Sequence, residues 1–213
     1  KEPTAGELLL VNWVLVLLRG IPVAIIVFGG LLIHTVLRIF EYPFLGSRRP
    51  LTQYVTQVVC KMSLFLLGIS ISVEGFPMKE KGAVVANHSS WLDIFALNAT
   101  QKIYFVAKSE VAKWPGIGWL ARATGTVFIQ RKAVQANKQK NILTDRLLVG
   151  HKLLFFPEGT STDSLRVLPF KSSLFAAFFE TNVPKNLFIQ PVTVIYHAPV
   201  GSNPWFYGWW GEM

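Results

Sequence analysis

Cysteine and charged residues are both scarce in this chain of 213 residues. Cys60 is the single cysteine, so no disulfide can form within the chain, and this fits a reducing compartment. Only 15% of the residues are charged, 51% are hydrophobic and the mean hydropathy is +0.39. This composition is apolar for a soluble domain and indicates contact with a membrane.

Acidic residues are scarcer than basic ones, with 12 Asp and Glu against 21 Lys and Arg, and the formal net charge is +9. Residues 102–152 hold ten basic and two acidic side chains, a local net charge of 10 − 2 = +8. Such a window attracts phosphate on lipid, cofactor or nucleic acid, although several of its residues can simply form a solvated helix face. No nucleic-acid motif accompanies the charge, so we expect no nucleic-acid partner.

A long apolar run occupies residues 8–40, and residues 20–37 contain no charged side chain. Eighteen such residues reach the lower limit for a helix that spans a membrane. Arg19, Pro22 and the glycine pair at 29–30 predict a break or kink rather than one straight helix. A signal peptide fits poorly because the run is long and no small-residue cleavage site follows it.

A second helix is expected at residues 51–68, after a loop at 41–50, because apolar side chains recur there at helical spacing. Residues 1–70 are therefore predicted to form a two-helix membrane anchor that either spans the bilayer or dips into one leaflet. The alternative is a helical hairpin buried against the rest of the chain. Basic side chains after the first helix favour the cytoplasmic side for that end: Arg38, Arg48 and Arg49.

From about residue 70, short apolar runs alternate with helical segments, which predicts an α/β domain over residues 71–213 with a mainly parallel sheet flanked by helices. The expected strands are 69–74, 83–86, 103–107, 126–129, 153–156 and 188–196. The expected helices lie near 91–98, 109–123, 134–149 and 172–181. In such a sheet, sites form where loops leave the carboxyl ends of the strands.

The turn after the 83–86 strand carries a histidine and a carboxylate five residues apart, His88 and Asp93. Histidine moves protons near neutral pH, and a carboxylate on its second nitrogen would fix its tautomer. The pair can meet only if His88 lies in the turn and Asp93 in the first turns of the next helix. Ser89 and Ser90 are plausible N-caps, so a capping arrangement with an incidental histidine is the competing interpretation.

Three further segments carry side chains that could contact a substrate. After the 153–156 strand, Glu158 supplies a carboxylate, Gly159 allows close approach of the backbone and Thr160 supplies a hydroxyl. The block from Lys108 to Arg131 ends in an arginine that could clamp an anionic headgroup, or could be an ordinary surface residue. The last expected strand contains Pro191, followed by Val and Thr. Proline is unusual in the centre of a strand, so it predicts a sheet edge or a bulge.

In this order, the four segments resemble the glycerolipid acyltransferase family, whose best-known members are the 1-acylglycerol-3-phosphate acyltransferases. The family pattern is Asn-His-x-x-x-x-Asp, then Lys…Pro…Gly…Gly…Phe-Ile-x-Arg, then Phe-Pro-Glu-Gly-Thr, then a strand that ends at a Pro-Val pair. The match covers residues 84–193, roughly half of the chain. Gln130 and Ser161 stand where many phosphatidic-acid-forming members have Asp and Arg, and residues 161–163 and 170–175 look more like bacterial lyso-ornithine-lipid acyltransferases.

The resemblance implies roles for seven residues. His88 is the expected general base, Asp93 orients it, and the remaining five are expected to bind the acceptor headgroup or to support it: Lys108, Arg131, Glu158, Gly159 and Thr160. No cofactor and no metal site are expected. The implied donor substrate is acyl-CoA or acyl carrier protein, and the implied acceptor is a lysolipid, with lysophosphatidic acid first and lyso-ornithine lipid as the alternative.

The implied reaction is direct acyl transfer at the cytoplasmic face of the inner membrane, where membrane lipids supply the acceptor. His88 removes the hydroxyl proton of the lysolipid, and the oxygen attacks the thioester carbonyl. Backbone N–H groups of the turns at Asn87 and Gly159 are expected to stabilise the oxyanion. Two other readings remain open: a hydrolase that activates water with the same pair, and a non-enzymatic basic module that binds membranes.

Overall fold

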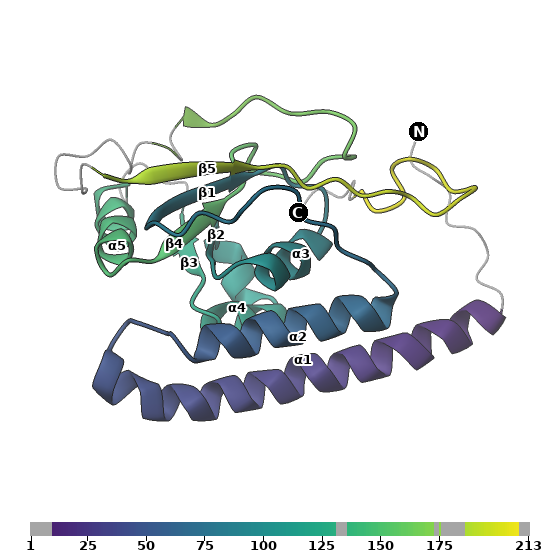
Figure 1. Cartoon of the computed structure of the whole chain (residues 1–213), viewed down its shortest axis with the longest axis horizontal. Coiled ribbons are helices and arrows are strands. Elements are labelled where there is room, and N and C mark those ends of the chain that lie inside the picture. The colour runs from purple at the N-terminus through teal and green to yellow at the C-terminus, as the bar shows by residue number, and fades with distance from the viewer. Residues whose placement is uncertain (1–9, 131–135, 173–174, 176–185, 209–213) are drawn as a thin grey trace.

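Five parallel strands form the centre of the protein in the computed structural model, which describes residues 10–130, 136–172, 175 and 186–208 (Figure 1). The strands are β1 (Gly82–Ala86), β2 (Tyr104–Lys108), β3 (Val127–Ile129), β4 (Lys152–Phe155) and β5 (Phe188–Val192). Their order in the sheet is β3-β2-β4-β1-β5, and every pairing is parallel. The predicted α/β fold with a parallel sheet is confirmed.

Burial on both faces explains why the strands read as continuous apolar runs. Val84, Leu153 and Leu154 have no exposed surface, as expected for parallel strands covered on both sides. Helices α3 (Leu92–Thr100) and α4 (Ile117–Ala123) lie between the sheet and the N-terminal helices (Figure 1). Helix α5 (Ala136–Leu148) contributes Leu143 and Leu147 to a core cluster with strands β2, β3 and β4.

The observed elements differ from the expected ones at three places. Residues 69–74 form no strand: β4 and β5 occupy both sides of β1, and Ile71 and Val73 lie exposed on the surface. The helix expected at 109–123 divides into a 3-10 helix (Ser109–Lys113) and α4, because Gly116 takes a left-handed φ of 71° between them. The last strand stops at Val192 and lies at the sheet edge, as its Pro191 predicted. The helix expected at 172–181 lies almost wholly outside the described residues.

Helix α1 (Leu10–Leu45) runs without interruption for 36 residues, so the predicted break is wrong, and the predicted kink stays a prediction. A Cβ added to Gly30 would lie 2.3 Å from Val59 Cγ2, which shows that this glycine permits close contact with helix α2 (Thr52–Leu67). The predicted loop at 41–50 is also wrong over its first half, because α1 continues to Leu45. The two helices lie side by side along one flank of the molecule (Figure 1).

Only one helix in the described part of the chain is long and apolar enough to cross a membrane, which corrects the predicted two-helix anchor. It is the Trp13–Leu45 part of α1, which contains an 18-residue window with a mean hydropathy of 2.4, and 11% of that window is buried within the fold. Helix α2 has 16 residues, about 24 Å at 1.5 Å per residue, against a hydrocarbon core of about 30 Å. It packs against both α1 and α3, where its polar residues Thr52 and Ser63 are buried. The domain boundary at residue 70 stays a prediction.

A buried glutamate joins the two N-terminal helices at their turn. The Glu41 carboxylate accepts hydrogen bonds from the Leu51 N–H and the Thr52 hydroxyl, both at 2.8 Å, and so caps the start of α2. From the same turn, Arg49 Nη1 donates to the Ala123 carbonyl oxygen at the end of α4, at 2.5 Å. The helical hairpin is therefore hydrogen-bonded to the α/β part of the chain.

Candidate active site

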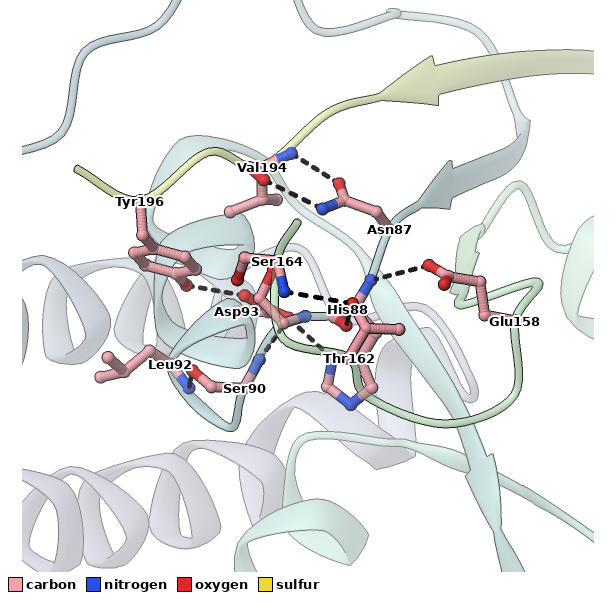
Figure 2. Close-up of polar contacts among 11 residues, drawn as sticks. Asn87, His88, Ser90, Leu92, Asp93, Glu158, Thr162, Ser164, Val194 and Tyr196 are labelled. Carbon is pink, nitrogen blue, oxygen red and sulfur yellow. Dashed lines mark hydrogen bonds and ion pairs between the residues drawn. The ribbon is translucent and has the colours of Figure 1, made fainter. Parts of the chain in front are cut away.

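The turn between β1 and α3 brings His88 and Asp93 into direct contact (Figure 2). His88 Nδ1 lies 2.7 Å from Asp93 Oδ2, and Asp93 occupies the first turn of α3. The N–H groups of Ser89 and Ser90 donate to the same carboxylate oxygen, at 2.7 and 3.1 Å, and Ser90 Oγ accepts the Leu92 N–H at 3.1 Å. The acid–base pair and the capping arrangement are thus both present, because the Asp93 carboxylate contacts the imidazole and also accepts the backbone N–H groups that precede the helix.

This geometry fixes which imidazole nitrogen is available for chemistry. A carboxylate at Nδ1 holds the neutral ring with its proton on Nδ1, and this leaves the Nε2 lone pair free to accept a proton. The side chain of His88 is 14% exposed, whereas that of Asp93 is fully buried, so substrate can reach the ring but not the carboxylate. Phe156 stacks on one face of the imidazole, with ring centroids 3.9 Å apart and planes 9° apart.

The segment after β4 makes hydrogen bonds to both the N–H and the carbonyl oxygen of His88. Because β4 pairs with β1, the two turns leave the sheet as neighbours. Buried Glu158 accepts the His88 N–H at 3.4 Å with Oε1 and the Leu168 N–H at 2.8 Å with Oε2. The Thr162 N–H donates to the His88 carbonyl oxygen at 2.9 Å. Glu158 therefore binds backbone with both oxygens, and its predicted contact with an acceptor headgroup stays a prediction.

Three other predicted substrate residues, Lys108, Gly159 and Thr160, lie at the ends of strands or in the turns that follow them. Gly159 has a φ of 72°, a left-handed conformation that suits glycine, and Thr160 follows it half-buried. Lys108 is the last residue of β2 and is also half-buried. Arg131 lies outside the described residues. The headgroup roles of these residues stay predictions.

Four backbone donors of these turns already have acceptors, and the expectation about the oxyanion stays a prediction. The N–H groups of His88, Ser89 and Ser90 already donate to the carboxylates described above. The Gly159 N–H donates to the Phe156 carbonyl oxygen at 3.0 Å, which closes the turn. These four groups are therefore used to build the site.

Two contacts from the end of the chain were not anticipated. The Asn87 side chain accepts the Val194 N–H at 2.7 Å and donates to the Val194 carbonyl oxygen at 3.0 Å (Figure 2). The Tyr196 hydroxyl donates to Asp93 Oδ1 at 2.7 Å. The available signal was the apolar alternation that continues past the Pro-Val pair and places residues 194 and 196 on one face of an extended segment.

Part of the basic window is structural rather than available for phosphate. Arg146 lies 4.6 Å from the centre of the Tyr104 ring and donates to the Gly125 carbonyl oxygen at 2.6 Å; burial lowers its pKa to about 10.

Cys60 is buried in α2, where burial raises the pKa of its thiol to about 12, so it does not act as a thiolate nucleophile. Within the described ranges, no three His, Cys, Asp or Glu side chains gather as a metal ion would require.

A cavity of about 660 Å³ borders the site without containing the imidazole. Asn87 and Tyr196 line it together with residues 164–167 and 191–195, whereas neither His88 nor Asp93 does.

Several known proteins are similar to this chain in sequence. A lyso-ornithine lipid O-acyltransferase from Rhodobacter capsulatus is 57% identical over 196 residues, which are 92% of this chain and 71% of that protein. A protein of the same name from Brucella abortus is 36% identical over 74% of this chain and 61% of its own length. A 1-acyl-sn-glycerol-3-phosphate acyltransferase from Neisseria gonorrhoeae is 40% identical over 67% of this chain and 56% of that protein.

A solved structure and a family model complete the comparison. The crystal structure of the 1-acyl-sn-glycerophosphate acyltransferase from Thermotoga maritima aligns with a TM-score of 0.49 and 23% identity, over 82% of this chain and 83% of that one. The model of the acyltransferase family matches residues 70–195, which include both turns and end one residue before Tyr196. This chain belongs to the acyltransferase family.

Proposed function

We propose that this chain transfers a fatty acyl group from the thioester of acyl-CoA or acyl carrier protein to the free hydroxyl of a lysolipid. The observation that carries the proposal is the His88–Asp93 contact at 2.7 Å, which leaves Nε2 free in a partly exposed turn. A base held in one tautomer suits removal of a hydroxyl proton, because the imidazolium that forms stays paired with the carboxylate.

The reaction proceeds in two steps on this geometry. Nε2 of His88 accepts the proton of the lysolipid hydroxyl while its oxygen attacks the thioester carbonyl, which gives a tetrahedral oxyanion. The carbon–sulfur bond then breaks, and the thiolate leaves with the proton that the imidazolium returns. The ester of the diacyl lipid and the free thiol are the products, and Asp93 stays ionised throughout.

Lyso-ornithine lipid is the first acceptor to test. The chain is 57% identical to the Rhodobacter capsulatus lyso-ornithine lipid O-acyltransferase, and Ser161 and Gln130 depart from the phosphatidic-acid pattern. Lysophosphatidic acid is the second acceptor, supported by the Neisseria gonorrhoeae relative at 40% identity and by the basic window at residues 102–152. A headgroup with a phosphate monoester carries more negative charge than a zwitterionic one, so basic side chains favour it.

The N-terminal helices support action at a membrane surface. Large apolar side chains are exposed along α1, and further exposed ones lie on α2, including Phe65 at 82%. Both the lysolipid and its diacyl product partition into bilayer, so a site on the membrane avoids moving them through water. We place the catalytic domain on the cytoplasmic face of the inner membrane, where the arginines after α1 favour that side.

The test is a transfer assay with two acceptors. Purified protein in detergent micelles is given radiolabelled acyl-acyl carrier protein or acyl-CoA together with lyso-ornithine lipid or lysophosphatidic acid. Labelled diacyl lipid supports the transferase, and the higher kcat/KM identifies the acceptor. Release of labelled fatty acid without diacyl lipid would show a hydrolase instead, and vesicle binding without turnover of either donor would show a non-enzymatic module.

His88→Ala is the control that ties the activity to this site. We expect it to abolish transfer while the circular dichroism spectrum and the melting temperature stay close to those of the parent, because His88 lies in a turn and is partly exposed. Substantial turnover by the folded variant would reject His88 as the base.

A further inference from the structure

The segment that follows β5 delivers a tyrosine to the buried side of the catalytic carboxylate. Tyr196 lies four residues beyond the end of β5, yet its hydroxyl donates to Asp93 Oδ1 at 2.7 Å. The other three hydrogen bonds of this carboxylate all reach Oδ2. Among the described residues, Tyr196 is therefore the one hydrogen-bond donor to Asp93 Oδ1.

Asn87 holds this segment in register. Its side-chain amide makes both hydrogen bonds to the backbone of Val194, and so continues the parallel pairing of β1 with β5 by two residues. In extended backbone, side chains two residues apart point the same way, and Tyr196 stands two residues after Val194. The residue before the catalytic histidine thereby fixes the place of the tyrosine that reaches the catalytic aspartate (Figure 2).

The phenol stays a hydrogen-bond donor over the working pH range. Burial raises the pKa of Tyr196 far above its usual range, and the negative charge of Asp93 raises it further. A neutral hydroxyl facing a fully buried carboxylate stabilises the charged form, which the His88 imidazolium needs as its partner.

Resting on the proposed acyl transfer, we propose that Tyr196 is a positioning residue of this reaction, and that the Asn87–Val194 clamp sets it in place. Its hydroxyl pins Oδ1, which fixes the rotation of the carboxylate and keeps Oδ2 directed at His88 Nδ1. The tyrosine touches no reacting atom and acts only through Asp93 and the imidazole.

Tyr196→Phe tests the proposal, and Tyr207→Phe is the matched control. The two rings lie 5.5 Å apart, so both variants remove a hydroxyl from one aromatic pair and keep the ring packing. We expect Tyr196→Phe to lower kcat about tenfold, equivalent to about 1.4 kcal/mol, with each substrate KM within about twofold. Its melting temperature should fall by a few degrees, because buried Asp93 Oδ1 loses its donor. We expect Tyr207→Phe to leave kcat within about twofold of the parent.

A pH profile separates positioning from a general loss of structure. Without the phenol, the carboxylate is less stabilised and pairs more strongly with the imidazolium, so the acidic limb of kcat against pH should move to higher pH in Tyr196→Phe only. Equal profiles and equal kcat in the two variants would overturn the proposal. A loss in kcat that comes with a lower melting temperature and an unmoved profile would assign Tyr196 a structural role and would also overturn it.

The clamp is tested by a double-mutant cycle with Asn87→Ala. If Asn87 acts through Tyr196, the double variant should be about as impaired as the poorer single variant. Fully multiplicative losses would show that the amide acts independently of the tyrosine. A parent protein that transfers no acyl group to any lysolipid would reject the proposed function instead, so the two failures are distinguishable.

Discussion

Replacing Asp93 by Asn removes one negative charge while the shape of the site is retained. The amide oxygen of the new side chain can take the place of Oδ2 and accept from the Ser89 N–H, the Ser90 N–H and the imidazole. Its NH₂ group then faces Tyr196, whose hydroxyl can rotate and accept where it formerly donated. The network therefore survives in Asp93→Asn with one hydrogen bond reversed.

The expected loss is large in catalysis and small in stability. The imidazolium formed during the reaction loses an ionised partner at 2.7 Å and keeps only a neutral one, which costs about 2–4 kcal/mol, or about 30- to 1,000-fold in kcat. Unfolding free energy should fall by only about 1 kcal/mol, because each donor keeps a partner. In Asp93→Ala, by contrast, buried N–H and O–H groups lose their acceptor, at about 1–3 kcal/mol each.

Steady-state kinetics and thermal unfolding of the two variants, measured side by side, test this reasoning. Asp93→Asn should melt within a few degrees of the parent, whereas Asp93→Ala should melt roughly 10 °C lower, at about 2–4 °C per kcal/mol. The loss in Asp93→Asn should still be smaller than that in His88→Ala, because the imidazole remains. A kcat for Asp93→Asn within about threefold of the parent would refute the charge-pairing argument, and equal melting temperatures for the two Asp93 variants would refute the hydrogen-bond argument.

Three other predictions address the substrate, the helical hairpin and pH. Arg131→Ala should raise the KM of the acceptor far more than that of the donor in the two-acceptor assay, and equal increases would reject its headgroup role. Gly30→Ala should destabilise the protein by about 1–3 kcal/mol because its Cβ would lie 2.3 Å from a side chain of α2, whereas Gly29→Ala, with nothing within 4 Å, should be neutral or slightly stabilising in melts. Burial is the chief reason why the pKa of His151 falls from 6.5 to about 3 in the folded protein. As the pH falls, His151 is therefore protonated in the unfolded chain before it is protonated in the folded one. Stability should decline below pH 6.5 by up to about 1.4 kcal/mol per pH unit, and His151→Gln should flatten the urea midpoint against pH; an unchanged slope would contradict this.

Local sequence patterns were enough to predict those parts of the site that lie at the ends of strands. The Asn87 and Glu158 turns each follow a short apolar strand, and parallel strands direct their carboxyl ends to one edge. His88 and Asp93 meet because only five residues and one turn separate them. These relations need no knowledge of the remaining chain.

Contacts between distant segments could not be predicted in the same way. The Tyr196–Asp93 hydrogen bond joins residues 103 positions apart, and it depends on β5 pairing with β1 in one register. The break expected in α1 is absent for a related reason, because Gly30 is explained by its contact with Val59 on another helix rather than by an interruption of the helix. In both cases the structure at the residue depends on the distant residue that it contacts and not on its own residue type.

The place of β1 between β4 and β5 has a consequence for synthesis of the protein. Strand β1, which precedes His88, is made before its partners: Gly82 pairs with Lys152 and with Phe188, 70 and 106 residues further along. At about 5–20 residues per second, β1 waits about 5–20 s on the ribosome for its second neighbour. Pairings of such high contact order form slowly, and the apolar strand stays open to wrong partners until they do. The candidate active site therefore cannot assemble before translation has passed Tyr196.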